Sequence, residues 1–455
     1  MTPEPRRPRL LYIAFYFPPS RASGVYRARA TANHFAAAGW DVTVFGAPLR
    51  FLYDVNGSTD EKLLETVDPR IRVERPELNL YRWQYELREM SWFRGTMPTV
   101  ARKFYEWRER RQFPEPYVSW GRSAVRRAVA MHRREKFDAV LATGNPFAAF
   151  AAAWAINRLT GLPYVIDYRD SWTLDLFTDG PNFPPRHPAW RWERRVMSRS
   201  SGAVFVNNAL REWHAQRYPK AADRMLVVPN GWDPDLLDVP ADRPPAGSGP
   251  DRPLKFGYLG TVTSVQPVEE MAAAFAEARK HPELAGAELN IYGHLGFFKH
   301  NHAQYLPRLG LNPQGEADPA TDIGIRLRGP VSKTEVSAVY EESDALVFMA
   351  AGGKYVTSGK IFEYMASGRP IVSVHAPGIA AGEVLAGYPL WFHADSLDPH
   401  EVAETFVAAG RAAREATPEV RAAARRHADN YLRDNLLMPL EDRMREIVAR
   451  PEDRP

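Results

Sequence analysis

The 455-residue sequence contains no cysteine, which excludes a disulfide framework, a thiolate metal site and a cysteine nucleophile. It also lacks a long apolar run, because the most apolar stretch, residues 147–156, is too short to span a bilayer. An apolar run at residues 10–17 follows several arginines, but two prolines come next and no A-x-A cleavage site is present. This pattern favours a buried first strand over a secretory signal, and we expect a cytoplasmic protein.

Several catalytic motifs are missing as well. The sequence has no H-E-x-x-H, G-x-x-x-x-G-K-[ST] or G-x-S-x-G pattern, so zincin, P-loop and hydrolase chemistry is not indicated. Zinc-finger and RNA-binding signatures are absent too, and we expect no nucleic-acid partner. The acidic pair in Asp233-Pro234-Asp235 lies in a proline-bounded segment and is interpreted as part of a turn.

Charge is divided unevenly along the chain. The formal net charge is +4, but residues 1–236 carry 36 Lys+Arg against 25 Asp+Glu, a net charge of +11. Residues 237–455 carry 23 against 30, a net charge of −7. Because a domain has roughly 150 residues, this length predicts two or three domains. The asymmetry favours two domains that meet different partners.

Short apolar runs alternate with helical patterns, which predicts α/β architecture with doubly wound parallel sheets. The alternation stops at a proline-rich polar segment and then restarts, so we predict two Rossmann-like domains. The predicted parts are residues 1–234 (with an insertion at about 54–121), a linker at 235–253, a second domain at 254–430 and a helical tail at 431–455. Strands are expected at 10–17, 40–45, 139–142, 164–167, 202–206, 226–228, 254–259, 288–292, 325–327, 345–349 and 370–374.

The loop at residues 18–24 follows the first predicted strand and precedes a helix. Gly24 would let the backbone approach a phosphate, and the helix N-terminus would add donors and positive potential. Arg21, Arg27 and Arg29 could add charge. The alternative is an ordinary strand-to-helix turn with surface arginines.

A second candidate, Asp167-Tyr168-Arg169-Asp170-Ser171-Trp172, ends a predicted strand at the sheet edge where ligands bind in α/β folds. Its two carboxylates could position a hydroxyl or orient Arg169 toward a phosphate. The alternative is a self-satisfied Asp–Arg pair that caps the next helix.

A third candidate is the segment KYVTSGKIFEYMASGRP at residues 354–370. Ser358 and Gly359 stand before a helix and offer backbone N–H groups to an anion, and Lys360 adds a cation. Glu363 follows one turn later and could accept the two hydroxyls of a ribose. The alternative is a surface Lys–Glu pair at i, i+3 spacing.

Three further strand-end loops could line the same region. They contain Gly260-Thr261, Gly293-His294 and Gly329-Pro330-Val331. His294 alone is more typical of a solvated loop histidine than of a catalyst.

Taken in order, these segments resemble the family 4 glycosyltransferases, retaining nucleotide-sugar enzymes of the GT-B fold. The resemblance covers nearly the whole chain and includes YVIDYRDSW, FGYLGT, NIYGHLG, RLRGPVSKTEV and SGKIFEYMASGRPIVSV. It implies two domains facing each other across a cleft, with C-terminal helices crossing back near Pro439. It also implies a nucleotide-sugar donor as co-substrate, an acceptor hydroxyl on a glycan, lipid or small molecule, no cofactor and no required metal.

The resemblance carries roles onto particular residues. Glu363 would hold the ribose, Gly24 would face the donor phosphates and Val331 would lie near the base. The implied catalytic residues are Asp170, Asp167 and Lys360. The implied donor-binding residues are Gly24, Arg27, Gly260, Thr261, His294, Val331, Ser358, Gly359, Lys360 and Glu363. The implied acceptor-binding residues are Arg169, Trp172 and Asn145.

Two departures from the family pattern bear on activity. Tyr355 stands where members commonly have a second glutamate, and Thr261 and Gln266 occupy the neighbourhood of a usual Arg and Lys. A diphosphate leaving group needs positive charge, which Lys360, a helix N-terminus and Arg21 or Arg27 could supply. The departures leave two alternatives open, a non-catalytic nucleotide-sugar binding or scaffold protein and a nucleotide-sugar epimerase.

Residues 93–111, FRGTMPTVARKFYEWRERR, interleave aromatic and basic side chains. Such a segment could lie on anionic headgroups, which would make the protein peripheral at the inner face of the membrane. The alternative is a charged helical insertion whose aromatics pack on their own domain.

Overall fold

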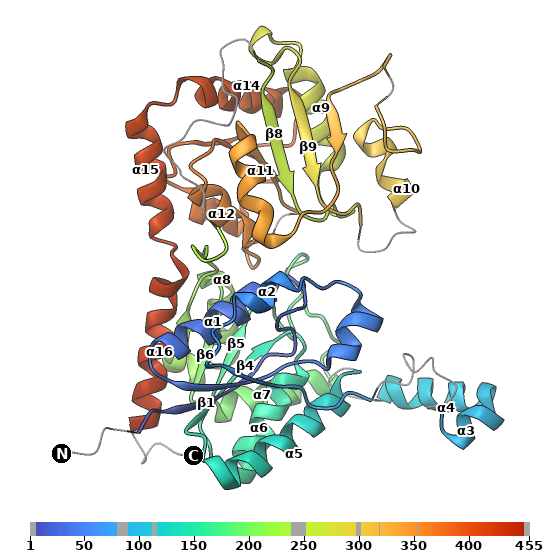
Figure 1. Cartoon of the computed structure of the whole chain (residues 1–455), viewed down its shortest axis with the longest axis vertical. Helices are drawn as coiled ribbons and strands as arrows, with labels where there is room; N and C mark the ends of the chain where they lie inside the picture. The colour runs from blue at the N-terminus through green and yellow to red at the C-terminus, as the bar shows by residue number, and fades with distance from the viewer. Residues whose placement is uncertain are drawn as a thin grey trace. The chain divides into compact units, whose positions relative to one another are not determined.

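The computed structural model describes residues 6–79, 90–111, 116–237, 252–296, 302–317, 319–351 and 353–449, the side chains of residues 108–111 excepted. The chain divides into two compact units (Figure 1). Unit 1 comprises Met1–Pro229 and Leu437–Pro455, and unit 2 comprises Asn230–Leu436. Most of the predicted linker, residues 238–251, lies outside the described residues. The same holds for residues 80–89 and 112–115 of the predicted insertion and 450–455 of the predicted tail.

Unit 1 is built on a parallel sheet that has seven strands within the described ranges, in the order β3-β2-β1-β4-β5-β6-β7. Its central strands are continuous apolar runs because helices cover both faces of the sheet. The strands are β1 (Arg9–Ile13), β2 (Asp41–Phe45), β3 (Arg72–Glu74), β4 (Ala139–Gly144), β5 (Tyr164–Tyr168), β6 (Gly202–Phe205) and β7 (Met225–Val227).

Helices flank this sheet on its two sides (Figure 1). On one side α1 packs Ala32 and Phe35 against Leu10 and Val42, and α16 adds Leu440 to the same core. Fully burying a side chain such as Phe35 stabilises the unit by about 1.5–3 kcal/mol. The helices are α1 (Val25–Ala37), α2 (Lys62–Glu65), α3 (Trp92–Thr96), α4 (Pro98–Arg111), α5 (Val118–Glu135), α6 (Ala148–Thr160), α7 (Pro188–Arg199), α8 (Asn208–Arg217) and α16 (Arg433–Ala449).

Unit 2 repeats the design with a parallel sheet of six described strands, in the order β10-β9-β8-β11-β12-β13. The strands are β8 (Lys255–Leu259), β9 (Glu288–Tyr292), β10 (Ile325–Leu327), β11 (Ala345–Met349), β12 (Ile371–Val374) and β13 (Trp391–His393).

The described residues of unit 2 form two large apolar cores. Phe275 of α9 and Phe406 of α14 cover Phe256 in one core. Tyr340 of α11 and Ile361 of α12 pack in the other. The helices are α9 (Val268–Ala278), α10 (His302–Tyr305), α11 (Val336–Glu342), α12 (Lys360–Ala366), α13 (Ala380–Leu385), α14 (Pro399–Glu415) and α15 (Pro418–Asp429).

The prediction of two doubly wound α/β domains is therefore confirmed. The carboxyl ends of parallel strands share one edge of each sheet, and this edge collects the loops that the sequence singled out. None of the described helices combines the length and apolarity that a bilayer crossing requires.

Candidate functional site

In unit 1 the predicted site residues follow three adjacent strands, β1, β4 and β5. Gly24 ends the loop after β1, Asn145 follows β4 and is exposed, and Arg169 follows β5. Trp172 is buried and stacks on Phe147, with ring centroids 5.3 Å apart and planes inclined by 2°. Asn145 and Arg169 are thus accessible to a ligand, whereas Trp172 contributes mainly to the core.

Gly24 and Arg169 are in close contact. A Cβ atom at residue 24 would overlap the Nη1 and Cζ atoms of Arg169, so a larger residue at this position would displace the guanidinium. Arg169 also binds Asp170, with Nη2 2.6 Å from Oδ2. Because Gly24 precedes the first residue of α1, the cation lies beside a helix N-terminus. Two sources of positive potential therefore meet at this loop.

Arg27 does not point toward the loop. Its guanidinium forms two 2.9 Å hydrogen bonds with the carboxylate of Asp167, and the two side chains are 4% and 2% exposed. The Nη1 atom also donates to the carbonyls of Val228 and Pro229. Burial alone would lower the pKa of Arg27, but the charge and hydrogen bonds of Asp167 raise it. This pair joins α1 to β5 inside unit 1.

In unit 2 the loop after β8 is built from glycine. Gly260 has φ of +123°, a value that favours glycine, and its carbonyl lies where a Cβ of Gly293 would be. The amide of Val262 donates to the carbonyl of His294 at 2.8 Å, while the His294 side chain is exposed. The ends of β8 and β9 are therefore joined through backbone contacts.

Lys360 of α12 extends to this glycine loop. A Cβ at residue 260 would overlap its Nζ and Cε atoms, and Nζ lies 5.1 Å from the centroid of the Tyr258 ring. Among the residues that the structure describes, no carboxylate pairs with this ammonium group. The Lys360 ammonium thus lies at the carboxyl edge of the sheet, against Gly260 and over the ring of Tyr258.

Glu363 is held by two residues that the sequence interpretation did not assign. Lys333 donates to Oε1 and the Tyr340 hydroxyl donates to Oε2 at 3.0 Å. Lys333 lies in the loop after β10, thirty positions away from Glu363 in sequence, so no local spacing could have revealed the pair. The surface Lys360–Glu363 pair considered above is therefore not the arrangement formed. Each carboxylate oxygen keeps acceptor capacity for a further hydroxyl.

Further predicted residues of unit 2 are near Lys360 and Glu363 in the chain or support the loop after β8. Ser358 and Gly359 directly precede α12, and Val331 packs at the edge of a core. Gln266 binds the Tyr258 hydroxyl and donates to the carbonyl of Met349 at 3.1 Å, so it supports the loop after β8. Tyr355, which occupies the position of the usual second glutamate, is buried.

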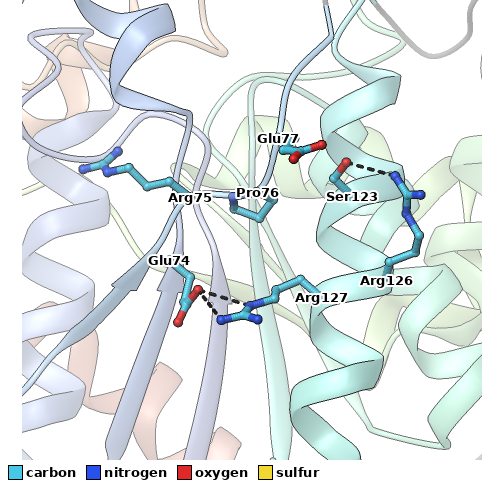
Figure 2. Close-up of a pocket in the computed structure, with 7 residues that line it drawn as sticks. All are labelled: Glu74, Arg75, Pro76, Glu77, Ser123, Arg126 and Arg127. Carbon is cyan, nitrogen blue, oxygen red and sulfur yellow. Dashed lines mark hydrogen bonds and ion pairs between the residues drawn. The ribbon is translucent and has the colours of Figure 1, made fainter.

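A separate hollow of about 470 Å³ lies in unit 1, next to β3 and α5 (Figure 2). Its charged groups bind one another and the backbone: Arg127 pairs with Glu74 at 2.9 Å, and Arg75 donates to the carbonyls of Ala47 and Pro18. Its other lining residues are Pro76, Glu77, Ser123 and Arg126. It contains none of the predicted site residues. Within the described ranges, no group of three His, Asp or Glu side chains could hold a metal ion.

Two parallel-sheet α/β units in one chain are the architecture of the GT-B fold. Residues 24–231 match the family described as glycosyl transferase 4-like domain, and residues 253–409 match glycosyl transferases group 1. The two matches take in most of both units. The chain therefore carries the two domains of a glycosyltransferase with the GT-B fold.

Solved structures with the same fold are distant in sequence. Sucrose-phosphate synthase from Thermosynechococcus elongatus has a TM-score of 0.65 at 14% identity, covering 97% of this chain and 100% of that one. A trehalose-phosphate synthase from Burkholderia vietnamiensis has a TM-score of 0.62 at 13% identity, and the match covers 97% of this chain and 99% of that one. Anabaena HepE in complex with UDP-glucose has a TM-score of 0.56 at 14% identity, and the match covers 95% of this chain and 99% of that one.

Proposed function

We propose that this protein is a retaining, metal-independent family 4 enzyme that transfers a sugar from a nucleoside-diphosphate sugar to an acceptor hydroxyl. The observation that carries the proposal is the ammonium of Lys360, which contacts Gly260 and pairs with no carboxylate among the described residues, one helical turn before the carboxylate of Glu363. A cation suits the diphosphate and a carboxylate suits the two ribose hydroxyls. Together they match the two ends of a nucleoside diphosphate.

In this mechanism the bond between the anomeric carbon and the diphosphate oxygen breaks, and both electrons leave with the diphosphate. The acceptor oxygen bonds to the anomeric carbon on the same face, and the hydroxyl proton passes to the departing phosphate oxygen. Lys360 stabilises the negative charge that develops on the diphosphate. In unit 1 Gly24 and Arg169 offer similar chemistry to phosphate oxygens. We assign contact with the reacting sugar to Asp170, because Asp167 is buried against Arg27.

We propose that UDP is the first nucleotide to test, since the solved structure of Anabaena HepE contains UDP-glucose. The acceptor is proposed to be a glycan, a lipid-linked sugar or a small molecule in the cytoplasm. Tyr355 in place of a second glutamate changes the contacts open to the transferred sugar, so the sugar itself is left to experiment.

Glu363→Ala is expected to weaken nucleotide binding about 10- to 100-fold, because it removes the charged acceptor to which the ribose hydroxyls would donate. The measurement is the rise in melting temperature of wild type and variant with UDP, GDP, ADP and dTDP and their common sugar conjugates. The wild type should respond to one base, and the variant should need far more ligand for the same rise.

Glu342→Ala is the matched control, because Glu342 is an exposed carboxylate at the end of α11, the helix that carries Tyr340. It should respond like the wild type. If Glu363→Ala binds the nucleotide as tightly as the wild type does, Glu363 does not hold the ribose. Nucleotide-sugar binding without transfer or hydrolysis across an acceptor panel would favour the scaffold alternative, and an epimerised free donor would favour the epimerase.

We also propose that α3 and α4 make a peripheral contact with anionic membrane. Trp92 and Trp107 are 77% and 50% exposed. Phe104 is also exposed and stacks on Trp107, with ring centroids 6.0 Å apart. Arg102 and Lys103 are exposed on the same helix. Exposed aromatics beside basic side chains suit the interface of an anionic bilayer.

The variant Trp92→Ser/Trp107→Ser is expected to lower binding to anionic vesicles by at least about tenfold, because two aromatic side chains no longer enter the interface. Sedimentation with phosphatidylcholine vesicles, with and without phosphatidylglycerol, measures the bound fraction. Phe177→Ser is the control, since Phe177 is also highly exposed but lies outside α3 and α4. Identical binding by the double variant and the wild type would contradict the proposed contact.

A further inference from the structure

A buried polar cluster in unit 1 takes no part in the reaction proposed above. Its centre is Glu193 of α7, which pairs with His214 of α8 at 3.5 Å between Oε1 and Nε2. We name these two residues the α7–α8 pair. Neither side chain has any exposed surface, so neither touches a substrate. An effect of the α7–α8 pair on a reaction must therefore pass through its neighbours.

Three hydroxyl groups donate to the carboxylate of Glu193. Tyr168, the last residue of β5, donates to Oε1 at 3.1 Å, and Thr173 donates to Oε2 at 2.6 Å. Tyr218, which follows α8, donates to Oε2 at 2.7 Å. Burial alone would raise the pKa of Glu193, but hydrogen bonds from His214 and from the hydroxyl groups outweigh burial and lower the pKa. An ionised carboxylate, which only accepts, fits this set of donors.

His214 continues the cluster to Ser171. Its Nδ1 atom lies 2.9 Å from the carbonyl of Leu210 in α8 and donates to it, because a carbonyl oxygen only accepts. Its Nε2 atom lies 3.4 Å from the hydroxyl of Ser171. The Ser171 oxygen also accepts from the amide of Leu174 at 3.1 Å, within the loop after β5. His214 is thus fixed by its own helix and holds this loop at Ser171.

These contacts lie on both sides of Arg169 and Asp170. Tyr168 precedes the two residues and Ser171 follows them, and both are bound to the α7–α8 pair. Arg169 and Asp170 are themselves partly exposed and bind each other. The cluster therefore anchors the chain before and after the two residues, while their side chains stay accessible from outside.

We propose that Glu193 and His214 are positioning residues for sugar transfer, which fix the loop after β5 so that Asp170 meets the reacting sugar in one orientation. This inference rests on the proposed function, in which Asp170 contacts that sugar. A displacement of about 1 Å at a reacting group can lower turnover by about 10²-fold, so a small shift of the loop is sufficient. The α7–α8 pair acts within unit 1 and does not depend on Lys360 or Glu363.

Glu193→Gln is expected to lower kcat for transfer about 10- to 100-fold, because the neutral amide keeps the volume but offers one oxygen acceptor in place of two. The rise in melting temperature with the nucleotide should stay close to that of the wild type, since Lys360 and Glu363 lie in unit 2. Hydrogen exchange needs no substrate. Peptides that contain residues 169–174 should lose protection by about tenfold or more, measured well below the melting temperature.

Two variants of His214 distinguish a positioning role from a merely structural one. Glutamine can place its side-chain amide near the position of Nε2 and bind Ser171, whereas alanine cannot. We therefore expect His214→Gln to keep most of the turnover that His214→Ala loses.

Asn157→Ala is the matched control. Asn157 is also buried in unit 1, and its side chain donates at 2.8 Å to the carbonyl of Leu162, which precedes the opposite end of β5. This variant should lower the melting temperature but leave kcat and the exchange of residues 169–174 unchanged.

If Glu193→Gln fails to fold, Ser171→Ala replaces it, because it removes only the hydroxyl that meets His214 and should change both readouts in the same direction. Unchanged loop exchange in a folded variant would overturn the proposal, and so would unchanged kcat once loop exchange has risen. If the wild type transfers no sugar to any acceptor, the proposed function fails instead. Loop exchange then decides by itself whether the α7–α8 pair holds the loop.

Discussion

Replacing Lys360 with alanine is expected to lower the turnover number for sugar transfer by about 10²–10³-fold, the usual effect of removing one group that stabilises developing negative charge. Lys360 Nζ contacts the glycine loop after β8 and the face of Tyr258, and no described carboxylate competes for it. The charge on the diphosphate grows as the glycosidic bond breaks. The variant should therefore lose more in kcat than in KM for the donor.

Steady-state kinetics with the donor found by the melting experiments measures both constants. Lys280→Ala is the control, because Lys280 is an exposed lysine just after α9 in the same unit and should leave both constants unchanged. Lys360→Arg is expected to remain impaired, because the larger planar guanidinium cannot take the place of the Nζ atom against Gly260 without a shift. Normal turnover in Lys360→Ala would assign the charge stabilisation to other groups.

Arg27→Met is expected to destabilise unit 1 by about 3–5 kcal/mol, because it leaves the buried carboxylate of Asp167 without its counter-ion. The loss should fall on β5, which carries Asp167. Hydrogen exchange of the β5 amides reports this change for unit 1 alone, as a fall in protection of about 10²–10⁴-fold.

An exposed pair provides the comparison for this prediction. Arg72 binds Glu74 and Glu135 but is half exposed. Arg72→Met should therefore lower the free energy of unfolding by no more than about 1 kcal/mol. The double variant Arg27→Met/Asp167→Leu should recover most of the stability, because it removes both charges together. A loss as small as that of Arg72→Met would mean that water or another group compensates Asp167.

The fold was largely predictable from the sequence, because each central strand is a continuous apolar run between helical segments. The residues 164–167 and 345–349 illustrate this, since they form β5 and β11, which are buried along their length. The short strands β3 and β13 were missed for the opposite reason. Each has three residues and is partly exposed at a sheet edge, so neither shows the apolar pattern.

The sequence predicted which residues lie at the ends of strands and helices, but not which of them contact one another. The sequence placed Gly260 and Lys360 at strand and helix ends, but their mutual contact depends on the fold across a hundred positions. Arg27 illustrates the limit. Its place in the Gly24 loop region suggested a phosphate ligand, whereas Asp167, 140 positions away, binds it in the interior. Charge in a sequence does not reveal whether a partner already neutralises it.

The path of α16 has a consequence for how the protein could be divided. The chain leaves unit 1 at Pro229 and re-enters it at Leu437, within this one helix. Leu440 packs in the core of unit 1, and Glu441 accepts a hydrogen bond from Trp40 at 2.7 Å. A fragment that stops at residue 229 would thus lose a wall of its own core. Unit 1 is therefore assembled from both ends of the chain, and we expect a fragment of residues 1–229 to be less stable than unit 1 in the full chain.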